Sequence, residues 1–279
     1  MKRNKSFDGS NILYLIATPI GNLKEFPPRS IEIINNADLV AAEDTRNAFS
    51  LLSHFNIKKE IISLREHNEK EASLHVVSLI KQGKKVVYMS DAGYPGISDP
   101  GNILVKECIK NDIKVSTING SSAFLSALVA SGLPSDKFYF YGFLSAQQNL
   151  AKEELKKASN YEDTLIFYES PHRILKTLNL LLEKLGDREA VIARELTKIN
   201  EEFIRGNLSE LVELDQNTLK GEMVIIIEGN HIKKSLSDGE IIAKVEYFTN
   251  KGMTKKDAIN AVSDIFEINK NKIKDLFNY

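Results

Sequence analysis

Features that mark several common protein classes are missing from this sequence of 279 residues. Its single cysteine, Cys108, excludes an intrachain disulfide and a cysteine-based zinc site. The longest apolar run near the start, Ile12–Ala17, is too short to span a bilayer, and the polar residues before it do not form a signal-peptide core. Charge of neither sign dominates, with 37 Lys and Arg against 38 Asp and Glu, which excludes a protein that coats nucleic acid through bulk charge. We therefore expect a cytoplasmic protein without a membrane segment.

Well-known nucleotide-binding and hydrolase motifs are also absent. No G-x-G-x-x-G follows the first expected strand, and no G-x-x-x-x-G-K-[ST] phosphate loop occurs, so NAD and ATP chemistry lack their usual support. The G-x-S-x-G motif of hydrolases is missing too. Five scattered histidines without ligand spacing predict no metal site.

Short apolar segments alternate with helical patterns through the first two hundred residues, and the pattern then repeats in a second unit. This alternation predicts a mostly parallel sheet with helices on both faces. The expected strands are 12–17, 38–42, 61–64, 85–89 and 114–118 in the first unit, and 138–141, 164–168, 189–193 and 222–228 in the second.

Length and pattern together favour two α/β domains and a small helical segment. We place the first domain at 11–118, the second at 119–230 and the helical appendage at 231–279, with 119–123 as the crossover between the first two. The appendage carries nine lysines against seven acidic residues. This slight excess leaves open both a plain helical appendage and a module that contacts nucleic acid.

Several residues typical of helix N-termini indicate where helices begin. The expected capping or first residues are Thr45 for the helix over 46–55, Asp99 and Pro100 for the helix ending at Lys110, Ser170 and Pro171 for the helix over 171–184, Thr254 for 255–266, and Asn269 for the helix ending at Tyr279.

Polar residues and glycines gather directly after the expected strands, where ligands of open α/β sheets bind. The segment 91–101 contains three glycines and two prolines, which allow its backbone to approach a ligand closely. Asp91 stands where a carboxylate could accept hydrogen bonds from an amine or a hydroxyl. A tight structural loop, with Asp99 as a helix cap, explains the same segment. The residues that could face one interdomain cleft are Thr18, Arg65, His67, Glu169, Arg173 and Arg194.

Five segments resemble one known family closely. They are Leu15–Leu23 (LIATPIGNL), Ala42–Arg46 (AEDTR), Ser90–Gly101 (SDAGYPGISDPG), Phe167–Arg173 (FYESPHR) and Ala193–Lys198 (ARELTK). All five stand in register with the ribosomal RNA small-subunit methyltransferase I family, part of the tetrapyrrole-methylase superfamily. The resemblance implies two α/β domains with S-adenosylmethionine between them. It also implies a homodimer that 2′-O-methylates a decoding-centre cytidine of 16S ribosomal RNA, as naked RNA or in an assembled 30S-type particle.

The same resemblance implies which residues touch the cofactor, and the chemistry of the transfer suggests candidates for catalysis. The implied cofactor-binding residues are Pro19, Ile20, Gly21, Asp91, Ala92, Gly93, Tyr94, Ile97, Ser121, Ser122, Ala123, Tyr168 and Ala193. A 2′-hydroxyl is a weak nucleophile, so a general base or a cationic neighbour should assist the transfer. The candidate bases are Glu43, His67 and Glu169, and the candidate charge stabilisers are Arg46, Arg65 and Arg173.

The sequence departs from the family pattern at two places. Gly120-Ser121-Ser122-Ala123 replaces the usual Gly-Pro-Ser-Ala, and the segment 145–150 is neutral where the family often has a basic, glycine-containing loop. A neutral loop weakens contact with RNA phosphates. The neutral loop motivates one alternative, a non-catalytic ribosome-binding protein of the same fold. A small-molecule methylase acting on a tetrapyrrole-like ring is a second alternative that stays open.

Overall fold

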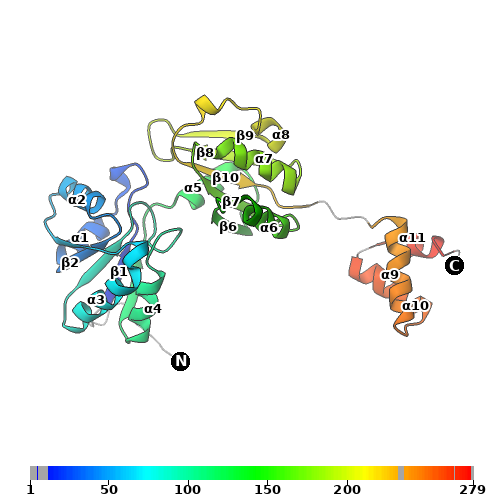
Figure 1. Cartoon of the computed structure of the whole chain (residues 1–279), viewed down its shortest axis with the longest axis horizontal. Coiled ribbons are helices and arrows are strands. Elements are labelled where there is room, and N and C mark those ends of the chain that lie inside the picture. The colour runs from blue at the N-terminus through cyan, green and yellow to red at the C-terminus, as the bar shows by residue number, and fades with distance from the viewer. Residues whose placement is uncertain (1–4, 6–11, 232–235, 267, 278–279) are drawn as a thin grey trace. The chain divides into compact units, whose positions relative to one another are not determined.

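The structure is a computed structural model that describes residues 5, 12–231, 236–266 and 268–277. Its internal contacts divide the chain into two compact units, residues 1–230 and 231–279 (Figure 1). The larger unit contains two five-stranded sheets. Within the described ranges, no helix is long and apolar enough to cross a membrane.

The first sheet is fully parallel, as expected, with strand order β3-β2-β4-β1-β5. Its strands are β1 (Ile12–Ile16), β2 (Leu39–Ala42), β3 (Glu60–Ser63), β4 (Val86–Met89) and β5 (Lys114–Ile118). Its helices are α1 (Pro28–Asn36), α2 (Thr45–His54), α3 (Glu69–Lys81) and α4 (Asn102–Lys110), with short 3-10 turns η1 (Leu23–Glu25) and η2 (Glu66–Asn68).

Alternation along the strands explains why this sheet is covered on both faces. In β4, Val86 and Tyr88 pack into one core with α3 and α4, whereas Val87 and Met89 pack into another with α1 and α2. Successive side chains of a strand point to opposite faces, so a strand without polar residues must be covered twice. All four of these residues are at most 1% exposed.

The second sheet corrects the expectation of a parallel repeat, because only β6 and β7 pair in parallel. The other pairs, β7–β10, β10–β8 and β8–β9, are antiparallel, in the order β6-β7-β10-β8-β9. The strands are β6 (Phe138–Phe143), β7 (Thr164–Glu169), β8 (Glu189–Arg194), β9 (Glu202–Asn207) and β10 (Met223–Ile227). Strand β9 was not expected, because its EFIRGN sequence contains polar residues and a glycine. It forms one edge of the sheet.

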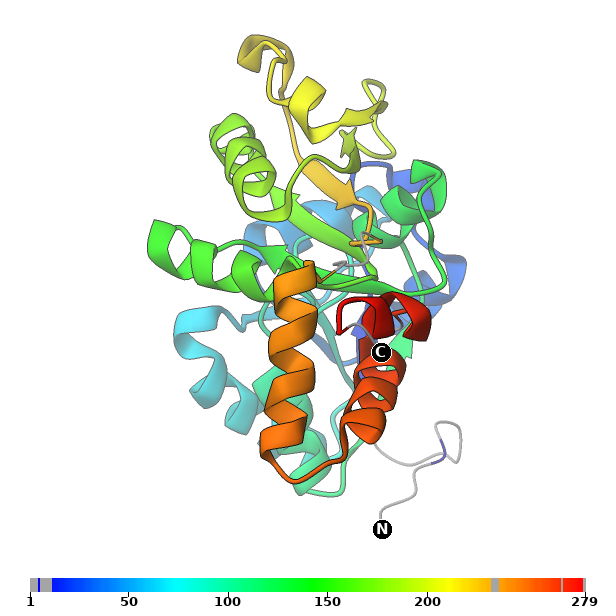
Figure 2. The same cartoon turned by 90° about the vertical axis from the view of Figure 1, so that its right-hand side faces the viewer.

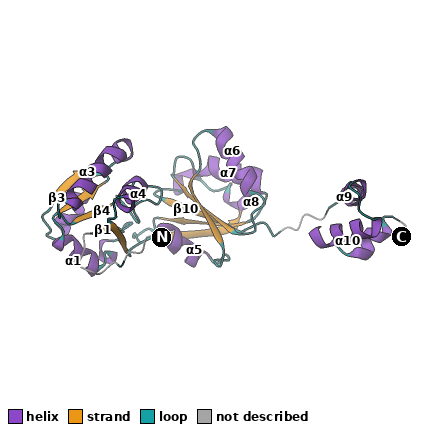
Figure 3. Ribbon diagram, turned by 90° about the horizontal axis from the view of Figure 1, so that it is seen from below, coloured by secondary structure: helices purple, strands orange, loops and turns teal. Residues whose placement is uncertain are grey.

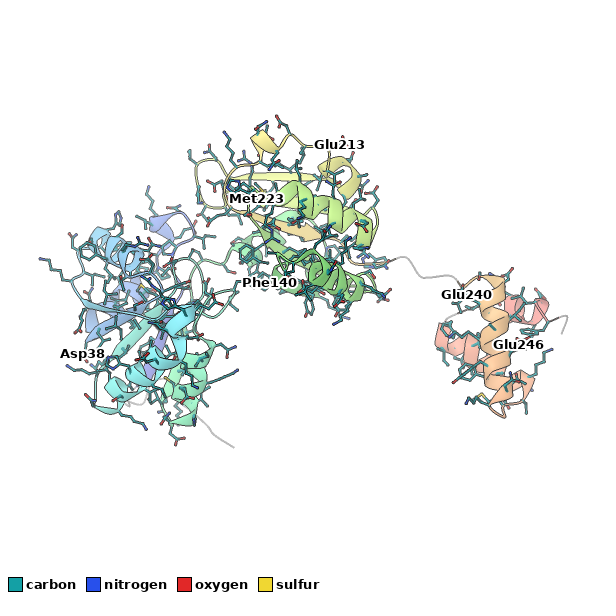
Figure 4. All side chains as sticks on the ribbon, viewed as in Figure 1. Asp38, Phe140, Glu213, Met223, Glu240 and Glu246 are labelled. Carbon is teal, nitrogen blue, oxygen red and sulfur yellow. The ribbon has the colours of Figure 1, made fainter. Side chains whose placement is uncertain are left out.

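Helices lie on both faces of this second sheet (Figure 3). They are α5 (Ala123–Ser131) on one side and α6 (Gln148–Ala158), α7 (Ile174–Leu185) and α8 (Leu208–Leu211) on the other, with a 3-10 turn η3 (Gln216–Thr218). Strand β10 is buried throughout: Met223, Ile225 and Ile227 contact the α6–α8 side, whereas Val224 and Ile226 contact α5. Figure 4 labels Met223 on this central strand and Phe140 on β6.

Three expected helix starts differ in the structure. Asp44, not Thr45, caps α2, because its side chain accepts a hydrogen bond from the Arg46 amide. Helix α7 begins at Ile174 rather than Pro171, after a turn in which the Ser170 carbonyl accepts from the Arg173 and Ile174 amides. Asp99 does not cap α4. That helix begins after Gly101, and a buried glutamate of α3 supplies its capping oxygen.

The smaller unit is a three-helix assembly formed by α9 (Asp238–Asn250), α10 (Lys255–Phe266) and α11 (Lys270–Asp275) (Figure 2). Apolar residues of all three helices form its core: Ile241, Val245, Ala258, Ile259, Val262 and Ile273. The expected caps Thr254 and Asn269 are confirmed by hydrogen bonds from the Asp257 and Asn271 amides. The expected extension of the last helix to residues 278–279, and domain positions 11 and 232–235, lie outside the described residues.

Candidate functional site

The site is built where the chain leaves β1 and β4, which are neighbours in the first sheet. The helix after β1 covers one face of the sheet and the helix after β4 covers the other, so the loops diverge at a topological switch point. Two hydrogen bonds nevertheless join them: the Thr18 amide donates to the Gly93 carbonyl at 2.9 Å, and the Gly93 amide donates back at 3.1 Å. The buried Thr18 hydroxyl donates to the Ser90 carbonyl at 3.2 Å. These bonds hold the two loops as one wall.

A cavity of about 300 Å³ lies between these loops and the second sheet. Side chains from both α/β halves of the larger unit surround it. Its lining residues are Ile20, Ala92, Gly93, Tyr94, Ile97, Ser98, Asp99, Ser122, Ala123, Phe124, Phe143, Tyr168, Glu169, Ser170, Pro171, Leu196, Glu222, Met223 and Val224. Apolar walls carrying a few carboxylates and hydroxyls are typical of small-molecule sites.

Eight of the thirteen residues predicted to bind the cofactor line this cavity. They are Ile20, Ala92, Gly93, Tyr94, Ile97, Ser122, Ala123 and Tyr168. The other five lie elsewhere. Pro19 and Asp91 line a separate hollow beside α2. Gly21 packs on Lys198, the Ser121 hydroxyl donates to Glu25, and Ala193 is buried in the core of the second sheet.

Asp91 occupies a structural position instead of facing the cavity. Its carboxylate accepts hydrogen bonds from the Asp44 amide at 3.1 Å and from the Asn47 side-chain amide at 2.9 Å. These bonds tie the end of β4 to the start of α2. Asp91 does lie at the end of β4, as the sequence predicts. The donors to its carboxylate, however, are protein groups rather than the amine or hydroxyl of a ligand.

Of the predicted catalytic candidates, only Glu169 lines the cavity. Glu43 lies at the end of β2, where the Arg65 guanidinium donates to its carbonyl at 3.1 Å. Arg46 is exposed and pairs with Asp44, and His67 is exposed in η2. The structure therefore does not assemble these candidates around one point.

Glu169 is held by its own neighbours. It is 3% exposed, and its carboxylate accepts from the Thr177 hydroxyl at 2.6 Å and from the Ser170 amide at 2.8 Å. The Arg173 guanidinium lies 3.5 Å from the same carboxylate and donates to the Leu144 carbonyl at 3.0 Å. A carboxylate that accepts from this many donors holds the 169–173 turn in place.

The segment 94–101 is fixed by interactions from several elements. Glu69 of α3 is buried, and its Oε1 accepts from the Gly101 amide at 2.8 Å and the Ile103 amide at 2.9 Å. A carboxylate there also stabilises the positive end of the α4 dipole. The Tyr88 hydroxyl donates to the Pro100 carbonyl at 2.9 Å. Ser98 has a φ of 62°, a backbone strain that a surrounding framework must maintain.

Asp99 in the cavity lining and Glu43 at the end of β2 both have raised pKa values. Burial, followed by the nearby negative charge of Glu43, raises the pKa of Asp99 to about 6. Burial and the charge of Asp91 raise the pKa of Glu43. Oε2 of Glu43 is buried and has no hydrogen-bond partner among the described residues. Burial also raises the pKa of the Tyr168 hydroxyl to about 12, so this group stays protonated at neutral pH.

Sequence reasoning missed part of the lining for a topological reason. Glu222, Met223 and Val224 come at the start of β10, which runs antiparallel to β7 and β8. Met223 therefore pairs with Glu169 and Arg194 at the carboxyl ends of those strands. In a parallel sheet, the residues at the ligand-binding edge all follow strands. Because β10 is antiparallel, the residues that it brings to this edge stand at its start instead. Asp99 was visible in its glycine-rich segment but was assigned a capping role.

Gly120 is the first test of this geometry. A Cβ at this position would lie 2.8 Å from the Ala17 carbonyl oxygen, and the Gly120 amide donates to the Tyr94 hydroxyl at 3.2 Å. We expect Gly120→Ala to lower the free energy of unfolding by about 1–3 kcal/mol and to displace the Tyr94 wall. Thermal unfolding and ligand calorimetry measure both effects.

Gly239→Ala is the matched control. It lies in α9 with nothing within 4 Å of the added Cβ, so alanine should raise stability by up to about 1 kcal/mol. Equal stability losses in the two variants would show that the contact with Ala17 is not the cause.

Two α/β halves with a cavity lined from both also occur in a known class of proteins. Residues 12–212 match the family profile of Tetrapyrrole (Corrin/Porphyrin) Methylases, so the chain belongs to that class. It also aligns over its whole length with proteins named ribosomal RNA small subunit methyltransferase I. It is 38% identical to that of Bacillus subtilis (strain 168) and 41% identical to that of Halalkalibacterium halodurans, covering 99% of each. Within the tetrapyrrole methylases, the chain is thus a member of the ribosomal RNA small subunit methyltransferase I family.

Solved structures share the fold at much lower identity. The methyltransferase CobJ matches with a TM-score of 0.60 at 16% identity, covering 79% of this chain and 95% of its own. Uroporphyrin-III-C-methyltransferase from Thermus thermophilus has a TM-score of 0.57 at 15% identity, covering 78% of this chain and 94% of its own. Diphthine synthase reaches 0.60 at 15% identity, covering 78% and 89%. At this identity the likeness concerns the fold alone.

Proposed function

We propose that this protein transfers a methyl group from S-adenosylmethionine to the ribose 2′-hydroxyl of a decoding-centre cytidine in 16S ribosomal RNA. The observation that carries the proposal is the match along the full chain. Relatives named for small-subunit ribosomal RNA cover all of the sequence, whereas the general methylase profile ends at residue 212, before the C-terminal helical unit. The part of the chain beyond the common methylase fold is therefore shared with RNA-modifying relatives.

The cavity suits S-adenosylmethionine in size and chemistry. Ile20, Ile97 and Leu196 provide apolar surface for an adenine ring. The Ser122 and Ser170 side chains line the cavity near where the ribose and amino-acid ends of the ligand would lie, and the Ser170 hydroxyl, which donates to Glu169 at 3.4 Å, keeps its oxygen as an acceptor. The cofactor supplies an electrophilic methyl carbon bound to a sulfonium.

The protein's own contribution is position and exclusion of water. The paired 17–22 and 90–94 loops and the 169–171 turn fix the walls before any ligand arrives. Holding the acceptor oxygen about 3 Å from the methyl carbon supplies much of the rate enhancement in such transfers. Arg46, Arg65 and His67 lie outside the cavity, and we propose that they face the RNA rather than the reacting atoms.

The chain carries a formal net charge of only −1, so contact with RNA phosphates would depend on local groups of basic residues. The neutral segment 145–150, where the family often has a basic loop, includes the first three residues of α6, and this helix carries Lys152, Lys156 and Lys157. We propose that these lysines, together with the folded surface of a small-subunit particle, compensate for the neutral loop. The protein would act in the cytoplasm as a homodimer, as the family resemblance implies.

The test is incorporation of label from S-adenosylmethionine with a tritiated methyl group. Small ribosomal subunits from a strain lacking this protein are incubated with the protein, and the label is mapped by nuclease digestion. We expect label on the 2′-oxygen of one cytidine. A shifted absorption band on mixing with a tetrapyrrole would instead favour a small-molecule methylase. Calorimetric binding of the cofactor, with no label on RNA or small molecules, would favour a binding role.

A further inference from the structure

The ionisable side chains that line the cavity differ in how far the fold already uses them. Glu169 is saturated by Ser170, Thr177 and Arg173. Glu222 is paired with the Lys198 ammonium at 2.9 Å. Asp99 is the remaining carboxylate among the lining residues of the cavity.

The two lining tyrosines offer hydroxyl oxygens rather than carboxylates. The Tyr94 hydroxyl already accepts a hydrogen bond from the Gly120 amide. Tyr168, whose pKa burial raises to about 12, keeps its proton at neutral pH. Elimination therefore leaves Asp99 as the lining group suited to accept a proton.

Asp99 also sits where the cavity meets the strand ends of the first sheet. The groups that act on it electrostatically come from three strands: Glu43 after β2, Tyr88 and Asp91 in or after β4, and Tyr168 of β7. The Ser90 side chain donates a hydrogen bond to it. None of these neighbours is a cation, so the carboxylate is not neutralised by an ion pair in the described surroundings.

The loop that carries Asp99 is fixed by hydrogen bonds on its C-terminal side and by a strained backbone position on its N-terminal side. Ser98, the preceding residue, has a left-handed φ of 62°. The following residues are fixed by Tyr88 at the Pro100 carbonyl and by Glu69 at the Gly101 amide. Strained backbone maintained by its surroundings is typical of positions where one side chain must point in one direction.

We propose that Asp99 is the general base that accepts the proton of the substrate hydroxyl during methyl transfer, and that Glu43 is a positioning residue that keeps Asp99 basic. This inference rests on the proposed function and names a base that the family resemblance did not indicate. As the oxygen–methyl bond forms and the carbon–sulfur bond breaks to leave a neutral thioether, the hydroxyl proton passes to an Asp99 carboxylate oxygen. Solvent then takes that proton.

The first readout needs no cofactor or RNA. The protein is labelled with ¹³C at aspartate side-chain carboxyls, and the Asp99 signal is assigned by its absence from Asp99→Asn. We expect this signal to titrate with a midpoint near pH 6. In Glu43→Gln the midpoint should move to lower pH, because a neighbouring negative charge that disfavours the carboxylate has been removed.

The second readout is the methylation rate on small subunits as a function of pH. A base with a pKa near 6 makes the rate fall as the pH drops through 6, and Glu43→Gln should move this fall to lower pH. Asp99→Asn should lower the rate by about 10²–10⁴-fold, with cofactor affinity within about threefold of the unaltered protein. Asp136→Asn, an exposed position that does not line the cavity, is the matched charge control.

The outcomes separate this inference from the proposed function. If the unaltered protein labels RNA and Asp99→Asn labels it equally well, Asp99 is not the base. A loss of cofactor affinity as large as the loss of rate would make Asp99 a binding residue and overturn the inference too. A titration midpoint of the Asp99 carboxyl near pH 4, or one that Glu43→Gln leaves unchanged, would show that Glu43 does not keep Asp99 basic. Cofactor binding without label by the unaltered protein would overturn the proposed function itself.

Discussion

Replacing Ala123 by phenylalanine is expected to abolish binding of S-adenosylmethionine. Ala123 is the first residue of α5 and lines the cavity beside Ser122 and Phe124. A phenyl ring there occupies space that the ligand needs, while the surrounding protein has an open cavity to receive it. We expect affinity measured by calorimetry to fall at least about 100-fold, equivalent to about 2.8 kcal/mol.

Ala130→Phe is the matched control for this variant. Ala130 lies on an exposed part of the same helix and does not line the cavity. Its affinity for the cofactor should stay within about twofold, and both variants should unfold at similar temperatures. Undiminished affinity in Ala123→Phe would show that the cofactor binds elsewhere.

Loss of the Glu69 carboxylate should destabilise the larger unit more than most single changes. Glu69→Ala leaves the buried Gly101 amide and the partly buried Ile103 amide without their acceptor, and an unsatisfied buried donor costs about 1–3 kcal/mol. We expect a loss of about 2–4 kcal/mol in the free energy of unfolding. Since 1 kcal/mol corresponds to about 2–4 °C in a domain of this size, the melting temperature should fall by roughly 5–15 °C.

Glu69→Gln separates the hydrogen bonds from the charge. A single oxygen, Oε1, accepts both bonds, and glutamine retains such an oxygen. Its stability should therefore fall by less than about 1 kcal/mol. Equal losses in Glu69→Ala and Glu69→Gln would mean that the charge at the α4 terminus, rather than the two hydrogen bonds, provides the stabilisation.

The position of the site was predictable because the first sheet is parallel. Apolar strands separated by helical patterns place Thr18, Glu43 and Asp91 at one sheet edge whatever the details of packing. The resemblance then implied which residues would touch the cofactor, and eight of those residues line one cavity.

The roles of individual side chains were less predictable, because hydrogen-bond partners come from distant parts of the chain. Asp91 was expected to face the ligand, yet Asn47, 44 positions away, binds its carboxylate. Asp99 was expected to cap a helix, yet Glu69 provides that oxygen from 34 positions before Ile103. Neither partnership leaves a local pattern in the sequence.

By itself, the sequence determined the α/β class and the family, and it placed polar residues and glycines at one edge of the first sheet. These depend on local periodicity and on short motifs that neighbouring residues specify. Only the tertiary structure decided that the second sheet is largely antiparallel, that Glu222–Val224 close the cavity, and which carboxylate remains available. Strand direction and side-chain pairing depend on contacts between residues far apart in the chain, and those contacts exist only once the chain has folded.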